Sequence, residues 1–566
     1  MKNNKTLRAA GLVLLAALLS QAHAAPAPQK TSEADKQAQR GAEYLSKKDW
    51  NRAAESFQKA VRADARHVEA NYGLGVAYMN LRRGAEALAA FSNVIAAQPN
   101  PRAREAYVNT GVIQFGLGRY KEAADALGLA APLGEIGTAG HYYLGKAYQQ
   151  TGRDAEALAS LRKAASDPQH APDANLSIGL LLLKQNRAKE AVEPLEQAVR
   201  LGAQPAPVAQ MLLGNAYVAA DRPEEALAAL RGADPGQFWT QFGLGWAHLA
   251  LYRSEEAVAA FNAALRLQPN SPEALVGLGN AYTRLTRYRE ASDAFGRALA
   301  AKADSAEALM GQAVLFYYQG QYPKLVAAAQ QAARVAPANA GAQTLLGAAL
   351  ATTGDMAGGL RATREAVRLE PENYWPHHVL GFILVREDKP QEALAEARAA
   401  ARLKPNYPET QNLLAYALNQ LGQHAEALQA AQAALQHKHE PADEGWAHYN
   451  IATAQEKLGR AEEARAAYGA SIRAYNQPGR TLDPDDLYLM GNAYLRLEQD
   501  AAAVKAFQQA INVRPNFAQA RYNLGVAYFA TGNRKGAQEE YNALRRLDPA
   551  RAAKLQSIIG GRPGRK

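Results

Sequence analysis

A small residue recurs at a nearly constant interval along almost the whole of this chain. Nine of the fourteen intervals between fifteen successive positions are 34 residues, and the others lie between 31 and 39. The positions are Gly41, Gly75, Gly111, Gly145, Gly179, Gly214, Gly245, Gly279, Ala313, Gly347, Gly381, Ala415, Ala452, Gly491 and Gly525. Such a period predicts a repeat architecture, in which each unit stacks on its neighbours to bury its apolar face. It excludes a split of the 566 residues into roughly three or four globular domains of ordinary size.

Other positions keep the phase of the small residue. Tyrosine or a large apolar residue usually follows three positions later, alanine follows twelve positions later in thirteen of the fifteen units, and a ring or leucine usually follows at sixteen. Spacings of three and four place side chains on one helix face, so each unit predicts two packed helices joined by a turn. Glycine suits a helix C-terminal cap in this turn, and a closing proline ends the second helix. The turn glycines are Gly118, Gly152, Gly422, Gly459 and Gly532.

Four consecutive units lack the ring at the sixteenth position. The residues there are Ala329, Thr363, Ala397 and Ala431. One interpretation is an exchange of volume between neighbouring positions, of the kind that cores tolerate. The other is a softer stretch of the array, which amide exchange would detect.

The combined pattern resembles the tetratricopeptide repeat. Leu74 to Tyr78 with Pro99, and Leu524 to Tyr528 with Pro549, match the family signature nearly position for position, and the resemblance covers residues 34–551. It implies an all-α, right-handed superhelical solenoid of about 15 helix-turn-helix repeats, with a concave face that binds a ligand. The resemblance does not identify the ligand.

The first 24 residues have the pattern of a secretory signal peptide. Lys2 and Lys5 form a basic region, Ala9 to Leu19 an apolar region, and Ala22-His23-Ala24 a small-x-small cleavage site. We expect cleavage after Ala24 and a periplasmic or secreted protein. Eleven apolar residues are too few to span a bilayer, so we expect no stable membrane insertion.

The rest of the chain divides by its repeat pattern. We expect a linker at 25–33, an array of about 13 repeats at 34–476, an interruption at 477–483 and two further repeats at 484–551. A capping helix and a basic tail are expected within 552–566.

No motif in the sequence predicts catalysis. The chain has no cysteine, and we find no phosphate-binding glycine loop, His-Glu-x-x-His or Gly-x-Ser-x-Gly motif. Acidic pairs such as Glu224-Glu225 are interpreted as helix N-terminal charges that the helix dipole favours. His437, His439 and His448 could ligate a metal, but they lie where polar residues are ordinary, between two repeats. We therefore predict a protein that is not an enzyme and has no cofactor or metal.

The charge does not predict nucleic-acid binding. The formal net charge is +10, and three of the positive charges lie in the leader, which leaves +7 for the remaining chain. No run of lysine or arginine is longer than three residues, so a solvated surface is the better interpretation.

The first helices of the repeats carry the candidate ligand residues. In the family geometry, positions three before, one after and four after the small residue line the concave face. Rings there would stack on peptide side chains or sugars, and amides would bond to a peptide backbone. Asparagine at the position of Asn215, Asn280 and Asn492 resembles the residue that holds a bound peptide in related repeats. The candidates are Trp239, Phe242, Trp246, Asn215, Asn280, Tyr317, Phe382, Tyr416, Tyr488 and Asn492, of which the cluster Trp239, Phe242 and Trp246 is the densest. Trp239 lies six residues before its small residue, on the same helix face.

Two functions fit this pattern. The first is a non-enzymatic protein-protein interaction scaffold of the bacterial cell envelope, which binds an extended peptide or a partner helix. Pilus, secretion and polysaccharide-export assemblies use such modules, by analogy at the level of the family. The alternative is a carbohydrate-binding protein for cell wall or exopolysaccharide.

Overall fold

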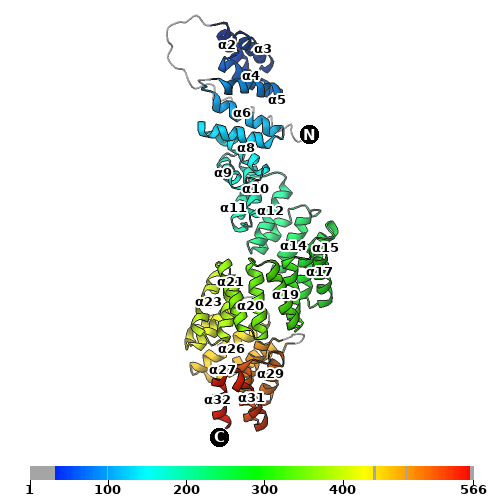
Figure 1. The fold of residues 1–566 in the computed structure, drawn as a ribbon, viewed down its shortest axis with the longest axis vertical. Helices are drawn as coiled ribbons and strands as arrows, with labels where there is room; N and C mark the ends of the chain where they lie inside the picture. The colour runs from blue at the N-terminus through cyan, green and yellow to red at the C-terminus, as the bar shows by residue number, and fades with distance from the viewer. Residues whose placement is uncertain (1–31, 98–99, 437–440, 478–481, 561–566) are drawn as a thin grey trace. The chain divides into compact units, whose positions relative to one another are not determined.

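The described part of the chain consists of helices joined by short turns. The computed structural model describes residues 32–97, 100–436, 441–477 and 482–560, and every regular element in these ranges is helical (Figure 1). Contacts divide the chain into a first unit, Met1–Leu267, and a second unit, Gln268–Lys566. No helix in the described ranges is long and apolar enough to cross a membrane.

The described residues of the first unit form seven helix hairpins, each made of a first and a second helix. The first helices are α2 (Glu33–Ser46), α4 (Val68–Asn80), α6 (Ala103–Gly116), α8 (Gly137–Gln150), α10 (Ala171–Lys184), α12 (Ala206–Ala219) and α14 (Phe238–Ala250). The second helices are α3 (Trp50–Ala63), α5 (Gly84–Ala96), α7 (Tyr120–Ala130) with the short η3 (Ala131–Leu133), α9 (Asp154–Ala164), α11 (Ala188–Arg200), α13 (Pro223–Leu230) and α15 (Ser254–Leu267).

Where the structure describes it, the second unit forms eight further hairpins and a final helix. The first helices are α16 (Pro272–Arg284), α18 (Ala306–Tyr318), α20 (Ala340–Thr353), α22 (Tyr374–Arg386), α24 (Pro408–Gln420), α26 (Pro441–Lys457), α28 (Pro484–Arg496) and α30 (Ala518–Ala530). The second helices are α17 (Tyr288–Ala301), α19 (Tyr322–Val335), α21 (Met356–Leu369), α23 (Pro390–Leu403), α25 (His424–Ala434), α27 (Ala461–Tyr475), α29 (Asp500–Val513) and α31 (Arg534–Leu547), followed by α32 (Pro549–Ile559).

In most repeats, the small residue makes room for the large residue of the same repeat, as the spacing predicts. A Cβ atom added at Gly75, Gly245 or Gly279 would lie 2.6 Å from a ring atom of Phe91, Phe261 or Phe295. These rings are fully buried. Any side chain at the glycine would therefore displace a ring that fills the core between the two helices.

The units without a ring obtain volume from neighbouring first helices. A Cβ atom added at Gly381 would lie nearest to Leu413 of the following repeat. One added at Gly359 would have Ile383, also of the following repeat, among its nearest neighbours. Both apolar residues are fully buried. An exchange of volume is thus visible in this stretch, in agreement with the first of the two interpretations.

Every hairpin turns through a residue with left-handed backbone conformation, seven positions after the small residue. Glycine occupies this position in seven repeats, with φ from 67° to 98°. These seven glycines include the five that are predicted as caps. The other eight repeats place other residues there, with φ from 55° to 61°. They are Lys48, Arg82, Asn186, Asp221, Tyr252, Thr286, Asp388 and Glu498.

Two neighbouring glycines offer a test of this turn. Gly116 is helical, Gly118 has φ +77°, and an added Cβ would meet no heavy atom within 4 Å at either position. We expect Gly118→Ala to lower the free energy of unfolding by about 1–2 kcal/mol, because alanine is strained in the left-handed region. Gly116→Ala should raise it by up to about 1 kcal/mol, because alanine favours the helix. Urea unfolding of the two variants measures both effects, and effects of equal sign would contradict the turn geometry.

The ends of the chain complete this description. The expected signal peptide, residues 1–24, and the basic tail, 561–566, lie outside the described residues, as do 478–481 of the expected interruption. Helix α32 covers the expected capping helix and begins earlier, at Pro549, because Asp548 accepts a hydrogen bond from the Arg551 amide as its N-cap. Its buried Leu555 packs against Gly525, where a ring packs in other repeats.

Candidate interaction surfaces

The structure brings three of the predicted aromatic residues together on one face of α14. Trp239, Phe242 and Trp246 are spaced by three and four residues, and their rings meet edge to face. The ring centroids of Trp239 and Phe242 are 5.4 Å apart, and those of Phe242 and Trp246 are 6.3 Å apart. Trp246 in turn contacts the fully buried Phe261 at 5.7 Å. We call Trp239, Phe242 and Trp246 the aromatic ladder.

One end of the aromatic ladder is exposed. Trp239 keeps 51% of its surface accessible, whereas Phe242 and Trp246 are half-buried. Phe238, which is buried, holds the first turn by stacking on Phe242 at 5.7 Å and by an edge contact with Trp239 at 5.0 Å. The ladder therefore presents a rigid indole ring to solvent on a fixed base.

Asn215 of α12 supports the aromatic ladder from the neighbouring first helix. Its Nδ2 donates a hydrogen bond to the backbone carbonyl of Trp239 at 3.2 Å. A Cβ at Gly243 would collide with the Asn215 amide oxygen, so the glycine is what permits this approach. Asn215 was predicted to hold a bound peptide, but its amide donor binds the chain's own backbone.

Two exposed aliphatic residues lie on the preceding first helices. Val208 of α12 and Leu180 of α10 occupy repeat positions equivalent to Trp239 and Trp246, and they are 38% and 44% exposed. We call these two residues and the ladder the apolar surface. Sequence reasoning missed Val208 and Leu180 because it considered only rings and amides at these positions, although the same repeat spacing identifies them.

The surface that the first helices of the repeats form together is polar at α8 and α10. Tyr142 donates a hydrogen bond to Asp173 and stacks on His170 at 4.7 Å. Lys146 Nζ lies 3.4 Å from Asp173 and donates to Ser177 Oγ at 3.0 Å. Burial raises the pKa of Tyr142, and the Asp173 carboxylate raises it further. The apolar surface is thus adjoined by a polar cluster whose charges are already paired.

Predicted residues in the second unit face the chain's own C-terminal repeats. Tyr317 of α18 donates a hydrogen bond to Asp483, the N-cap of α28, with 2.8 Å between Oη and Oδ2. Burial raises the pKa of this tyrosine, and the carboxylate of Asp483 adds to the effect. Tyr317 is therefore engaged by a segment 166 residues further along the chain.

A buried ion-pair cluster lies beside Tyr317. Arg514 donates two hydrogen bonds to the Asp485 carboxylate, at 3.1 and 2.7 Å, and Arg386 Nη1 lies 3.7 Å from the same group. The Arg514 side chain is only 1% exposed. Its Nε donates to the Thr352 carbonyl at 2.9 Å. Four segments, α20, α22, α28 and the end of α29, therefore meet at this cluster.

Burial and charge act in opposite directions within the cluster. Burial alone would raise the pKa of Asp485, but the guanidiniums of Arg386 and Arg514 outweigh it and hold that pKa below its ordinary value. Burial raises the pKa of Asp483, and the neighbouring Asp485 charge adds to this. Burial also lowers the pKa of Arg386 to about 10.

Four more predicted residues of the second unit contact other side chains of that unit. Phe382 and Tyr416 meet Trp446 with ring centroids 6.0 and 6.3 Å apart. Tyr488 packs against Phe507 and Phe517, and Asn492 accepts a hydrogen bond from Asn523 at 2.6 Å. Asn280 of α16 is half-buried, and its side-chain amide forms no hydrogen bond with the residues that the structure describes.

The cluster around Asp485 was not predicted. An aspartate in the first turn of a helix is an ordinary N-terminal charge, and arginine is common throughout the chain, so neither residue is marked out by the repeat. The partners are also far apart in sequence. No local signal could have identified Arg386, Asp485 and Arg514 as one site.

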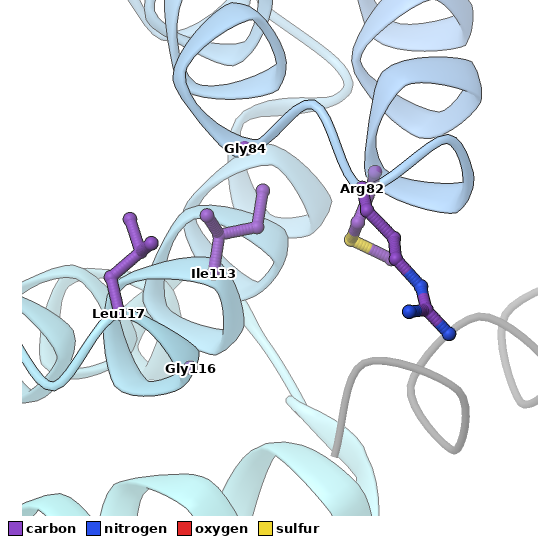
Figure 2. A pocket seen from close by; sticks show the side chains of 6 residues that line it. Arg82, Gly84, Ile113, Gly116 and Leu117 are labelled. Carbon is purple, nitrogen blue, oxygen red and sulfur yellow. The ribbon is translucent and has the colours of Figure 1, made fainter. Parts of the chain in front are cut away.

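The described residues contain no cluster of metal-ligating side chains of the usual kind. No group of three or more histidine, aspartate or glutamate side chains in these ranges could hold a metal ion, and His437 and His439 lie outside them. A small pocket of about 50 Å³ between α6 and the turn before α5 is lined by Met79, Arg82, Gly84, Ile113, Gly116 and Leu117 (Figure 2). None of the predicted site residues lines it.

Together the helix hairpins and their first-helix surfaces define an all-helical repeat solenoid of the kind that binds other proteins. Models of the tetratricopeptide repeat match residues 44–110, 176–239, 248–315, 380–445, 447–478 and 518–551, and a further TPR repeat model matches 491–532. The chain belongs to the tetratricopeptide repeat family.

One solved structure illustrates the fold. A chain of the crystal structure of the APC/C hetero-tetramer Cut9-Hcn1 superposes with a TM-score of 0.50 at 14% identity, over 88% of this chain and 96% of that one. At this identity the likeness shows the fold alone. No curated protein matches the sequence.

Proposed function

We propose that this repeat protein is a non-enzymatic scaffold that binds an extended peptide or a helix of a partner protein on the apolar surface of the first unit. The observation that carries the proposal is the aromatic ladder, whose Trp239 is half exposed although its base is packed into the core. Exposed aromatic anchors on rigid supports are typical of the few residues that dominate binding energy at interfaces.

The character of the apolar surface supports an apolar segment as its ligand. The exposed residues are aromatic or aliphatic, and the charges of the adjoining polar cluster are paired with each other. A partner segment with apolar side chains along one face would cover Leu180, Val208 and Trp239 without leaving a charge unpaired.

Site-specific crosslinking tests this proposal. The full chain would carry a photoreactive residue at 239, or at 252 as a control, because Tyr252 is equally exposed, at 54%, but lies in a hairpin turn. We expect one protein to crosslink at 239 and not at 252. Trp239→Ala should weaken binding of that purified partner by about 2 kcal/mol, or roughly thirtyfold, whereas Tyr252→Ala should change it less than twofold. Equal effects of the two variants would refute the surface.

The same experiment bears on the cellular location. We propose export to the bacterial cell envelope because of the leader pattern at residues 1–24, and pilus, secretion or polysaccharide-export assembly as the setting. A crosslinked partner that resides only in the cytoplasm would contradict this location.

Carbohydrate binding is the second candidate, and the exposed indole of Trp239 is the observation that favours it. An indole face stacks on a sugar ring as well as on a peptide side chain. Cell-wall and exopolysaccharide fragments on a glycan array should then bind the native chain and not Trp239→Ala. An array without signal removes this alternative.

A further inference from the structure

The long-range contacts of the second unit form one ordered seam. On one side are the C-terminal ends of the first helices α18, α20 and α22, and on the other are the N-terminal ends of α28, α30 and α32 with the residues that precede them. The pairs are Tyr317 with Asp483, Thr352 with Arg514, Gly354 with Asn516, and Asp388 with Arg551, and each pair is 162 to 166 residues apart. Successive repeats on one side thus contact successive repeats on the other side, in the same order.

The chemistry of the two sides is complementary. The last carbonyls of a helix lack partners within the helix and carry a partial negative charge. Arg514 donates to the Thr352 carbonyl at 2.9 Å, and Gln519 donates to the Arg386 carbonyl at 3.0 Å. These donors pair with C-terminal carbonyls of α20 and α22. The seam is therefore held largely by polar contacts and by the ion pairs of Asp485.

The seam also covers aromatic residues of the first helices. Tyr416 and Trp446 pack against the apolar cluster that contains Leu487 and Met490 of α28. Asp485 and Tyr488 of α28 lie close enough to Tyr416 to raise its pKa, in addition to the larger effect of burial. Tyr416, which is expected to meet a ligand, is therefore in contact with the chain's own C-terminal repeats.

We propose that residues 484–559 are the resident ligand of the first-helix surface of the second unit, held by the Asp485 ion pairs as a clasp that must open before an external protein can reach that surface. The clasp is the seam just described, and Arg514 is its central residue. The proposal is independent of the first unit's apolar surface, whose Trp239 is exposed without any such opening.

Introduced cysteines test whether the clasp is closed in solution, because the chain contains none of its own. A side chain at Gly354 would touch Asn516, so Gly354→Cys with Asn516→Cys should form an intramolecular disulfide in the full chain. Gly422→Cys with Asn516→Cys is the matched control. Gly422 is also a left-handed turn residue, with φ +78°, but an added Cβ there meets nothing within 4 Å.

We expect the first pair to close at least tenfold faster than the control pair. Adding Arg514→Met should slow closure at least tenfold and increase binding of the apolar dye ANS, with the helical circular dichroism retained. Closure no faster than in the control, or only between molecules, would overturn the proposal. Unchanged closure and dye binding in the Arg514→Met variant would also overturn it.

A milder variant distinguishes opening of the clasp from general unfolding. If Arg514→Met loses helical signal, Gln519→Ala removes one donor to the Arg386 carbonyl and leaves the buried charges paired. It should slow closure severalfold without loss of helicity, and closure at the native rate would count against the clasp.

Discussion

Phe295→Ala is expected to lower the free energy of unfolding of the second unit by about 3–5 kcal/mol. The ring is fully buried between two first helices. An added Cβ at Gly279 of α16 would lie 2.6 Å from it, and one at Gly311 of α18 would also collide with it. Truncation therefore leaves a cavity between successive repeats that only a shift of a helix could close. Urea unfolding followed by circular dichroism measures the loss.

A second substitution at Gly279 makes the test specific for this packing. In the native chain Gly279→Ala should be destabilising by about 1–3 kcal/mol, because the methyl group displaces the ring. In the Phe295→Ala background the obstacle is gone, and alanine should stabilise the helix by up to about 1 kcal/mol. The sign of the Gly279 effect should thus reverse.

Leu547→Ala is the matched control for this pair, because Leu547 is an apolar residue of the same unit that remains exposed. Its effect should stay within about 0.5 kcal/mol. A destabilising Gly279→Ala in both backgrounds would mean that the repeat register is wrong.

The sequence predicts the hairpins well because their geometry repeats. The small residue, the ring or leucine that stands sixteen positions later in most units and the turn between them are local features, and they recur along the chain. The contact of Gly279 with Phe295 follows directly from this spacing. Even the left-handed residue at Tyr252 or Thr286, which no glycine marks, is located by its phase.

The candidate surfaces divide into a predictable part and an unpredictable part. The aromatic ladder could be found from sequence because its three rings lie on one helix face at regular spacing. The contact of Tyr317 with Asp483 could not be found in this way. It depends on how far the second unit curls over several repeats, which small differences in every hairpin determine together.

The charge pairing of Asp485, which lowers its pKa, predicts the second large effect, a loss of clasp stability in Asp485→Asn. Asp485→Asn leaves Arg386 and Arg514 buried without a carboxylate, and we expect a cost of about 3 kcal/mol to clasp closure near neutral pH. Closure of the Gly354→Cys, Asn516→Cys pair, followed in increasing urea, measures this as a lower midpoint of clasp opening.

Acid should remove the difference between the native chain and this variant. The pKa of Asp485 is lower in the folded chain than its ordinary value of 3.8, so its contribution is present above that value and is lost as the pH falls through the folded pKa. The two midpoints should therefore stay apart from pH 8 to 5 and converge below about pH 4. Asp483 acts in the opposite sense, because its raised pKa favours the folded state when it is protonated.

Asp483→Asn is the closest control that the chain offers, since it makes the same chemical change two residues away. Asparagine remains a good N-cap, because its Oδ1 can accept the hydrogen bond of the Asp486 amide. The Tyr317 hydroxyl, which donates to the other oxygen of Asp483, can instead accept a hydrogen bond from the asparagine Nδ2. Burial and the Asp485 charge already disfavour the ionised form of Asp483, so we expect a cost below about 1 kcal/mol at neutral pH. If the two asparagine variants cost the clasp equally, the ion pairs of Asp485 do not hold it, and burial of apolar side chains must be the larger contribution.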